Sequence, residues 1–355
     1  MTKEFIQKAH QIYNCLQDEE SKKIFMYKLN WAITGDIDPL IQYAIQKDYN
    51  EFHKKIKYLA EENEVIIYGA GVNCLRVMQI CKDIRINYIC DRDAEKQAEG
   101  VHGIVVISPE ELLKNHKNAA IIISTTKYQN EVLEQLGSVF SRDKIELFFP
   151  YEQERAKQQY FDNDIMKFSE NEVFVDCGCY DFGTSKELMK KCKVKKIFAF
   201  EPDSQNIRKI EQEISRYPEC EIKLVKKGLW DKTAVLAFLA TGDMESYIIE
   251  SGQVEQELEM NINENAIKIN VAAMDDIIKE PISFIKMDIE GSELKALQGA
   301  KNLIQTYRPK MAICIYHKLE DIIDIPAYIA DLVSDYKFYI RQYSYGPCET
   351  VLYVV

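Results

Sequence analysis

The sequence predicts an α/β protein with a seven-stranded sheet in its C-terminal half, a second, smaller α/β unit before it and a helical N-terminus. Short apolar runs that end in glycine or acidic residues alternate with segments whose apolar residues recur at helical spacing. This alternation occurs twice, once over residues 61–150 and again over residues 171–355. Strands that alternate with helices form parallel sheets, so each stretch predicts a sheet of its own.

Residues 1–60 are interpreted as helices, because apolar residues such as Ile41, Ala44 and Ile45 recur on one helix face. From residue 61 to 150 the runs VIIYGAG, INYICDRD and AAIIIST predict three strands of a small Rossmann-like unit. The charged, Gln-rich residues 151–170 are interpreted as a linker helix. The second series then predicts seven strands, at residues 173–176, 197–201, 222–225, 282–288, 309–316, 337–342 and 350–355.

Composition excludes several classes of protein. A net charge of −12 opposes binding to nucleic acids and to anionic membranes. No apolar run approaches the roughly 20 residues of a membrane span, and the first residues lack the apolar stretch of a signal peptide, so a cytoplasmic protein is expected. The ten cysteines include no CxxC pair and no Cys/His quartet, which argues against a zinc site or a disulfide framework.

The segment FIKMDIEGSELKALQGA, residues 284–300, carries the clearest functional signal. An apolar strand runs directly into Asp288, Glu290 and Glu293 and then into a helix, and the carboxyl edge of an α/β sheet is where ligands bind. Three acids within six residues repel one another, so a ligand, a metal or a cation such as Lys286 is expected to offset them. The alternative is an acidic helix N-terminus without a function.

A second motif, VFVDCGCYDFGTS, predicts a strand, a sharp turn and the start of a helix. Gly178 and Gly183 would let the backbone approach a ligand closely, with the helix N-terminus facing it. The next predicted strand ends in Glu201, whose carboxylate can accept hydrogen bonds from both hydroxyls of a ribose. The order of these motifs therefore indicates a nucleoside ligand.

Over residues 165–355 the chain resembles the FkbM-type S-adenosylmethionine-dependent methyltransferases. The resemblance rests on VDCGCYDFGTS, FEPD, KMDIEGSELKALQGA and the closing RQYSYGPCETVLYVV. It implies a class I methyltransferase sheet, with Glu201 on the ribose of the cofactor and the motif of Asp176 and Gly178 at its methionine end. The expected cofactor site comprises Asp176, Gly178, Gly183, Glu201, Asp203, Trp230 and Asp288. One departure is that Phe182 stands where many relatives carry glycine, which puts the shape of the turn in doubt.

Methyl transfer from a sulfonium is an in-line displacement, so aligning the reactants and excluding water supply most of the acceleration. For a hydroxyl acceptor, a carboxylate or imidazole could take the proton, and Asp288, His317 and Glu290 are the candidate catalytic residues. Glu290 and Glu293 could instead orient the acceptor or bind Mg²⁺, although no second cluster completes a metal site, and none is assigned. Trp230 could stack on adenine or belong to the core, and Ser246 and Tyr247 fall where relatives cover the active site.

The smaller unit suggests a dinucleotide site, because Gly69 and Gly71 follow its first strand and Asp91 ends the next. Cys74 stands where the third glycine of GxGxxG belongs, which argues against a working dehydrogenase. The unit looks similar to small Rossmann-like domains that precede some sugar-modifying enzymes and recognise nucleotide-linked sugars. Nucleotide recognition and a purely structural role both stay open.

The resemblance implies an S-adenosylmethionine-dependent methyltransferase that acts on oxygen, with a sugar hydroxyl, a glycan or another small metabolite as the acceptor. The alternatives are an NAD(P)-dependent oxidoreductase that uses the turn at Gly69 and a sensor that binds a cofactor or sugar nucleotide without turnover. No nucleic-acid partner is expected, and homo-oligomerisation is left open.

Overall fold

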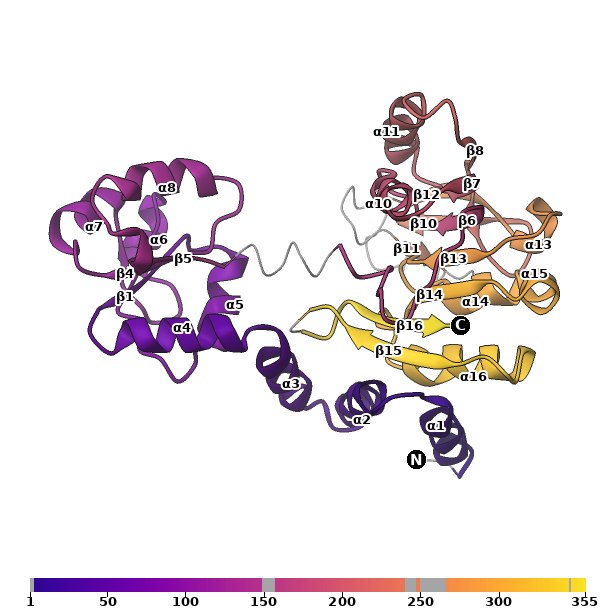
Figure 1. Cartoon of the computed structure of the whole chain (residues 1–355), viewed down its shortest axis with the longest axis horizontal. Helices are drawn as coiled ribbons and strands as arrows, with labels where there is room; N and C mark the ends of the chain where they lie inside the picture. The colour runs from indigo at the N-terminus through magenta and orange to yellow at the C-terminus, as the bar shows by residue number, and fades with distance from the viewer. Residues whose placement is uncertain (1–2, 149–156, 240–246, 250–265, 345) are drawn as a thin grey trace. The chain divides into compact units, whose positions relative to one another are not determined.

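The computed structural model describes residues 3–148, 157–239, 247–249, 266–344 and 346–355 of the chain (Figure 1). The chain forms two compact units. Unit 1 consists of two chain segments, Met1–Leu40 and Lys157–Val355, and unit 2 is the segment between them, Ile41–Ala156. Each unit is built on a parallel or mostly parallel sheet of its own.

The main sheet of unit 1 has seven strands in the order β15-β16-β14-β13-β6-β7-β8. Its strands are β6 (Glu172–Cys177), β7 (Val194–Phe200), β8 (Glu221–Val225), β13 (Phe284–Met287), β14 (Lys310–Cys314), β15 (Phe338–Gln342) and β16 (Thr350–Val354). The seven predicted strands are confirmed, each within a few residues of its predicted bounds. Strand β16 runs antiparallel to both of its neighbours, β14 and β15, and the other pairs of neighbouring strands in this sheet are parallel. Every residue of β13 is buried, as expected of a central parallel strand that is covered on both faces.

Helices connect these strands, and a second sheet follows β8. The described helices after β6 are α10 (Gly183–Lys191), α11 (Ser204–Ile214), α13 (Met274–Ile277), α14 (Glu293–Gln298), α15 (Lys301–Tyr307) and α16 (Asp321–Leu332). The second sheet has the order β11-β10-β12-β9, with bounds β9 (Gly228–Leu229), β10 (Ala234–Leu239), β11 (Tyr247–Ile249) and β12 (Ala266–Ala272). The sequence analysis did not predict this sheet.

The first helices of the chain pack on its last strands. Helix α1 (Lys3–Cys15) contacts α16, and α2 (Glu19–Thr34) contacts β15. The Ser21 hydroxyl accepts a hydrogen bond from the Ile340 N–H at 2.8 Å, and the Arg341 guanidinium lies 2.7 Å from the Asp18 carboxylate. Residues 1–60 were expected to form a separate segment, but residues 1–40 belong to unit 1. The reason is that α1 and α2 pack on elements more than 300 residues later in the chain.

Unit 2 has five parallel strands in the order β3-β2-β1-β4-β5. The strands are β1 (Val65–Tyr68), β2 (Tyr88–Cys90), β3 (Val106–Ile107), β4 (Ala120–Ile123) and β5 (Ile145–Leu147). The helices are α3 (Asp38–Asp48), α4 (Asn50–Ala60), α5 (Val72–Ile80), α6 (Ala94–Glu99), α7 (Pro109–Asn115) and α8 (Gln129–Gly137), followed by the 3-10 turn η1 (Arg142–Lys144). Helix α3 begins in the first segment of unit 1, which ends at Leu40. Helix α4 packs on β1 and β4, with the Phe52 ring 5.6 Å from that of Phe148.

Residues 151–156 of the predicted linker helix lie outside the described residues. From residue 157 to 170 the described backbone forms turns and no helix. Among the described helices, none combines the length and the apolar character that a bilayer span requires.

Candidate active site

A pocket lies at the carboxyl edge of the seven-stranded sheet, where β6, β7 and β13 end. This is the edge at which open α/β sheets bind their ligands. Its lining combines backbone of the turn after β6 with acidic side chains that follow β7 and β13. The lining residues are Tyr160, Gly178, Cys179, Tyr180, Asp181, Thr184, Phe200, Glu201, Pro202, Asp203, Asn206, Lys227, Gly228, Leu229, Lys286, Asp288, Ile289, Glu290 and Ser292.

The turn after β6 depends on Gly178. Its φ of 77° lies in the left-handed region, and a Cβ on this residue would stand 1.9 Å from the Asp288 carbonyl oxygen. A side chain is therefore excluded by both backbone strain and contact. The absence of the side chain brings the β6 turn directly against the first residue after β13.

Lys286 and Asp176 form a buried ion pair beneath this turn. The Lys286 Nζ lies 3.5 Å from Asp176 Oδ1 and donates a hydrogen bond of 2.7 Å to the Gly178 carbonyl. Burial alone would lower the pKa of Lys286, but the Asp176 charge raises it above its usual value. Asp176, predicted to contact the cofactor, is fully buried, does not line the pocket and also accepts a 2.7 Å hydrogen bond from Ser185. Asp176 therefore lies behind the pocket lining, where it pairs with Lys286.

Glu201 lines the pocket directly after β7 and is 5% exposed. Its two oxygens accept hydrogen bonds from the N–H groups of Tyr180 and Asp203, each at 2.9 Å. Burial raises the pKa of Glu201, and these two hydrogen bonds oppose that shift. Asp203 in turn caps α11 by accepting from the N–H groups of Gln205 and Asn206. A carboxylate has about four acceptor positions, so Glu201 keeps capacity for hydroxyl donors of a ligand.

Asp288, the first residue after β13, presents its carboxylate to the same pocket. Its Oδ2 accepts a hydrogen bond of 2.7 Å from the Tyr160 hydroxyl. Burial and the Asp288 charge raise the pKa of Tyr160 well above its usual value, so the phenol stays protonated and acts as the hydrogen-bond donor. The Tyr160 ring also lies over Lys286, with Nζ 5.2 Å from the ring centroid.

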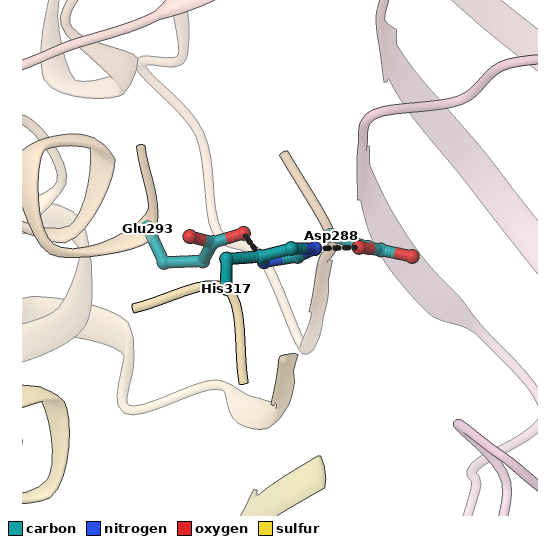
Figure 2. Close-up of side chains that lie close together, drawn as sticks. All are labelled: Asp288, Glu293 and His317. Carbon is teal, nitrogen blue, oxygen red and sulfur yellow. Dashed lines mark ion pairs between the residues drawn. The ribbon is translucent and has the colours of Figure 1, made fainter. Parts of the chain in front are cut away.

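His317 lies among the three acids that follow β13. Its Nε2 is 3.4 Å from Asp288 Oδ1 and 3.2 Å from Glu290 Oε2, and its Nδ1 is 3.0 Å from Glu293 Oε1. Figure 2 shows the imidazole between Glu293 and Asp288. Burial alone would lower the pKa of His317, but these carboxylates raise it to about 11. The ring is therefore an imidazolium at neutral pH, and its positive charge lies beside the three acids. The sequence analysis had expected a ligand, a metal or a cation such as Lys286 in that place.

Comparisons with known proteins identify the family of one stretch of unit 1. Residues 176–341 match the family model described as the methyltransferase FkbM domain. This stretch is an FkbM methyltransferase domain. Residues 61–146 in unit 2 match a second model, described as C2185-like, N-terminal. A comparison with curated proteins found no match.

Solved structures agree with the FkbM assignment at the level of the fold. The methyltransferase FkbM of Methylobacillus flagellatus KT is 19% identical, aligns over 95% of this chain and 99% of its own, and has a TM-score of 0.50. An rRNA methylase of Streptococcus thermophilus is 14% identical over 57% of this chain and 92% of its own, with a TM-score of 0.34, too low to support an argument. The first of these structures supports the class I methyltransferase fold, the methyltransferase assignment rests on the family model, and neither structure bears on the acceptor.

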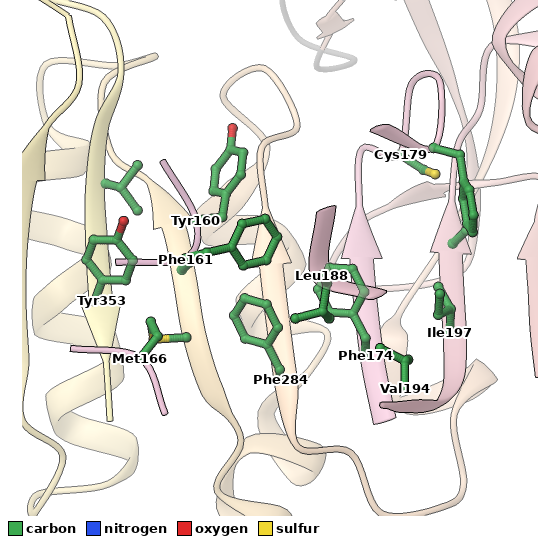
Figure 3. Packing of buried hydrophobic residues seen from close by; sticks show 14 of the residues in the cluster. Tyr160, Phe161, Met166, Phe174, Cys179, Leu188, Val194, Ile197, Phe284 and Tyr353 are labelled. Carbon is green, nitrogen blue, oxygen red and sulfur yellow. The ribbon is translucent and has the colours of Figure 1, made fainter. Parts of the chain in front are cut away.

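Tyr160 of unit 1, which precedes the FkbM domain in the chain, lines the same pocket and was missed by the sequence analysis. Its segment was interpreted as a linker helix, yet Tyr160 belongs to the aromatic core beneath the pocket (Figure 3). Its ring lies 6.4 Å from that of Phe161, which lies 6.2 Å from that of Phe284 on β13. These contacts position the hydroxyl at Asp288. Only the aromatic character of the segment could have signalled such a role.

Two other expected cofactor residues of the FkbM domain lie away from the pocket lining. Trp230 packs with Ile269 and Val271 beside the second sheet, so the prediction that it lines the adenine site is not supported and the core alternative holds. Gly183 begins α10, where its N–H donates to Asp181. Phe182 before it adopts a φ of 67° and is fully buried, which answers the doubt about this turn. Ser246 lies outside the described residues, and Tyr247 is described only as the start of β11.

The acids around His317 also bear on a metal. Asp288, Glu293 and His317 each offer a ligand atom, all within 4.8 Å of one another. A metal bound there would compete with the proton of the imidazole, because a protonated ring cannot coordinate a metal. The Mg²⁺ that the sequence analysis considered and the proton of His317 are thus alternative partners of this cluster.

The His317 cluster predicts a pH dependence of stability. Because the folded pKa of about 11 exceeds the ordinary 6.5, the contribution of His317 is complete below pH 6.5 and is lost as the pH rises toward 11. Relative to a His317→Gln variant, the wild type should lose at most about 1.4 kcal/mol of unfolding free energy per pH unit in that range. Urea unfolding of both proteins at pH 6 and pH 9 measures this. An equal difference at the two pH values would show that folding does not raise the pKa of His317.

Proposed function

We propose that the FkbM domain transfers a methyl group from S-adenosylmethionine to a hydroxyl of a sugar or of another small metabolite. The observation that carries this proposal is that one pocket contains both Glu201 and Asp288. The first is a buried carboxylate with acceptor capacity for a nucleoside, and the second is a carboxylate that could receive a proton.

The residues of the pocket fit a nucleoside-bearing cofactor. Glu201 is held rigidly by two backbone N–H groups and has room to accept from ribose hydroxyls. Asn206 and Asp203 add polar groups on the same side, from the first turn of α11 and its cap. S-adenosylmethionine, when bound, supplies a methyl group on a sulfonium, which needs no activation by the protein.

The chain's own residues would then act on the acceptor. Asp288 is oriented by the Tyr160 hydroxyl on one oxygen and faces the His317 imidazolium with the other. A carboxylate oriented in this way can accept the proton of an acceptor hydroxyl as the new C–O bond forms. His317 was a candidate base in the sequence analysis, but an imidazolium cannot accept a proton, so its proposed role is to position Asp288 and Glu290.

The acceptor class is tested by direct assay. The purified protein is incubated with methyl-labelled S-adenosylmethionine and a panel of sugars, nucleotide sugars, glycans and small hydroxylated metabolites. Mass spectrometry should find a gain of one methyl group on an oxygen of at least one sugar or small-molecule acceptor. Transfer to nitrogen or carbon alone would contradict the assignment to oxygen, and failure to bind S-adenosylmethionine would contradict the cofactor.

Replacing Glu201 by alanine should weaken S-adenosylmethionine binding by roughly 30- to 1000-fold. The variant loses two charge-assisted hydrogen bonds to ribose, at a cost of about 2 to 4 kcal/mol. Calorimetric titration measures the affinity, with Glu201→Gln as the matched control that keeps the volume and one acceptor oxygen. Unchanged affinity in a folded Glu201→Ala protein would remove Glu201 from the cofactor site.

A further inference from the structure

Unit 2 contains a cleft of its own at the carboxyl edge of its parallel sheet. The strand order β3-β2-β1-β4-β5 reverses direction between β1 and β4, which is the switch point at which such sheets bind ligands. The cleft opens there and is lined by residues that follow β1, β2 and β4. They are Tyr68, Gly69, Ala70, Gly71, Val72, Asn73, Asp91, Arg92, Asp93, Lys96, Ser124, Thr125, Thr126, Lys127, Tyr128 and Val132.

Asp91 is held in this cleft by two backbone N–H groups. Its Oδ2 accepts from Ala70 at 2.7 Å, and its Oδ1 accepts from Asp93 at 3.0 Å. Asp93 then caps α6, by accepting from the N–H groups of Glu95 and Lys96. The carboxylate of Asp91 is therefore fixed directly after β2, with Lys96 Nζ 3.9 Å from Oδ2, and it keeps acceptor capacity beyond these two hydrogen bonds.

The same arrangement surrounds Glu201 in the FkbM domain. In both units an acid directly after the second strand accepts a hydrogen bond from a backbone N–H in the turn that follows the first strand: Asp91 accepts from Ala70, and Glu201 accepts from Tyr180. Each acid also accepts from the backbone N–H of the aspartate two residues later in the chain, Asp93 or Asp203, and that aspartate caps the next helix.

Two backbone hydrogen bonds extend this correspondence. The glycine after the first strand donates to the last residue of the second strand, from Gly69 to Cys90 at 2.8 Å in unit 2 and from Gly178 to Phe200 at 3.2 Å in the FkbM domain. The residue that follows the third matched strand, β4 or β13, donates its backbone N–H to the last residue of the first strand. The pairs are Ser124 to Tyr68 in unit 2 and Asp288 to Cys177 in the FkbM domain. The two clefts thus share the same set of hydrogen bonds around the acid, although different residues form them.

The other side of the unit 2 cleft suits a phosphate. Gly71 caps α5, and a Cβ on it would meet no atom within 4 Å, so the helix N-terminus is open to the cleft. Thr125, Thr126 and Lys127 contribute hydroxyl groups and an ammonium group from the end of β4. Cys74, at the position of the missing third glycine, is fully buried and does not line the cleft, so it does not obstruct a ligand there as the sequence analysis expected.

We infer that unit 2 binds a ribonucleotide, with the ribose hydroxyls on Asp91 and a phosphate between the N-terminus of α5 and Lys127. Carboxylate acceptors recognise the ribose, while helix N–H groups, hydroxyl groups and a lysine recognise the phosphate. This site is separate from the proposed cofactor pocket and does not depend on methyl transfer.

The test uses the full chain and compares variants of the two matched acids. Calorimetry measures the binding of ADP, GDP, UDP, CDP and NAD⁺ to the wild type, to Asp91→Ala and to Glu201→Ala. For at least one nucleotide, Asp91→Ala should weaken binding at least about tenfold, whereas Glu201→Ala should leave it unchanged. S-adenosylmethionine should show the reverse pattern, which separates a failure of this proposal from a failure of the proposed function. The 2′-deoxy form of the nucleotide that binds should bind at least about tenfold more weakly.

A second pair of variants addresses folding and the phosphate. Gly71 has a φ of −96° and open space around it, so Gly71→Asp and Gly71→Asn should both fold. The aspartate would repel a phosphate, and the isosteric asparagine would not, so only Gly71→Asp should weaken binding by tenfold or more. The proposal is overturned if no nucleotide of the panel binds, if binding is lost in Glu201→Ala and kept in Asp91→Ala, or if the two Gly71 variants bind equally well.

Discussion

Replacing Asp288 by asparagine is expected to lower kcat by about 10²- to 10⁴-fold, the range typical of losing a positioned general base. Asparagine keeps the volume and can still accept the hydrogen bond from Tyr160, so the pocket should keep its shape. It cannot take up the proton of an acceptor hydroxyl. Because this interaction develops in the transition state, the affinity for S-adenosylmethionine should change little. Single-turnover kinetics with an acceptor that the wild type methylates, once identified, gives the rate directly.

Two further variants separate the proton acceptor from the groups that orient it. Tyr160→Phe removes only the hydroxyl that holds Asp288, and His317→Gln removes the imidazolium beside it. Each should reduce kcat less than Asp288→Asn does. A fall below tenfold in Asp288→Asn together with a large fall in His317→Gln would transfer the role of base to His317. Such a result would also require His317 to be neutral in the working enzyme.

Replacing Lys286 by methionine should cost about 3 to 5 kcal/mol of unfolding free energy, the range for breaking a buried ion pair by removing one partner. Lys286 is 3% exposed and Asp176 is fully buried, so the variant leaves a carboxylate in the core without its countercharge. The carbonyl of Gly178 also loses its donor. Chemical denaturation at neutral pH measures the loss.

The matched control for Lys286→Met is the double variant with Asp176→Asn. Asparagine carries no charge and can still accept from Ser185, so the double variant should recover a substantial part of the lost stability. If the two changes destabilise the domain additively, the pair does not interact, and the stability of the turn at Gly178 has another source.

The features of this chain that were predictable from sequence are those encoded within short segments. Each of the seven strands of the main sheet is a local apolar run, and the acids at Glu201 and Asp288 directly follow such runs. Because parallel strands end at one edge of the sheet, their order along the chain was sufficient to bring Glu201, Gly178 and Asp288 to one pocket.

The remaining features depend on contacts between distant segments, for which the sequence has no local signal. Lys286 lies within the apolar strand β13 and His317 follows the apolar strand β14, and only the packing shows which acid each one pairs with. Tyr160 reaches Asp288 across 128 positions of sequence. Trp230 could equally have stacked on a ligand or filled the core, because an aromatic ring suits both places.

The division of unit 1 into two chain segments has a consequence for the order of events during synthesis. Helix α2 buries Ile24 and Phe25 and meets β15 through the contact between Ser21 and Ile340, 319 positions later. At about 5 to 20 residues per second, a ribosome needs roughly 15 to 60 s to cover that interval. Unit 2 is complete well within this time and can fold first, while α1 and α2 remain without the surface that covers them. The earliest helices of the nascent chain are therefore among the last to reach their native packing, and until then their apolar faces are accessible to chaperones.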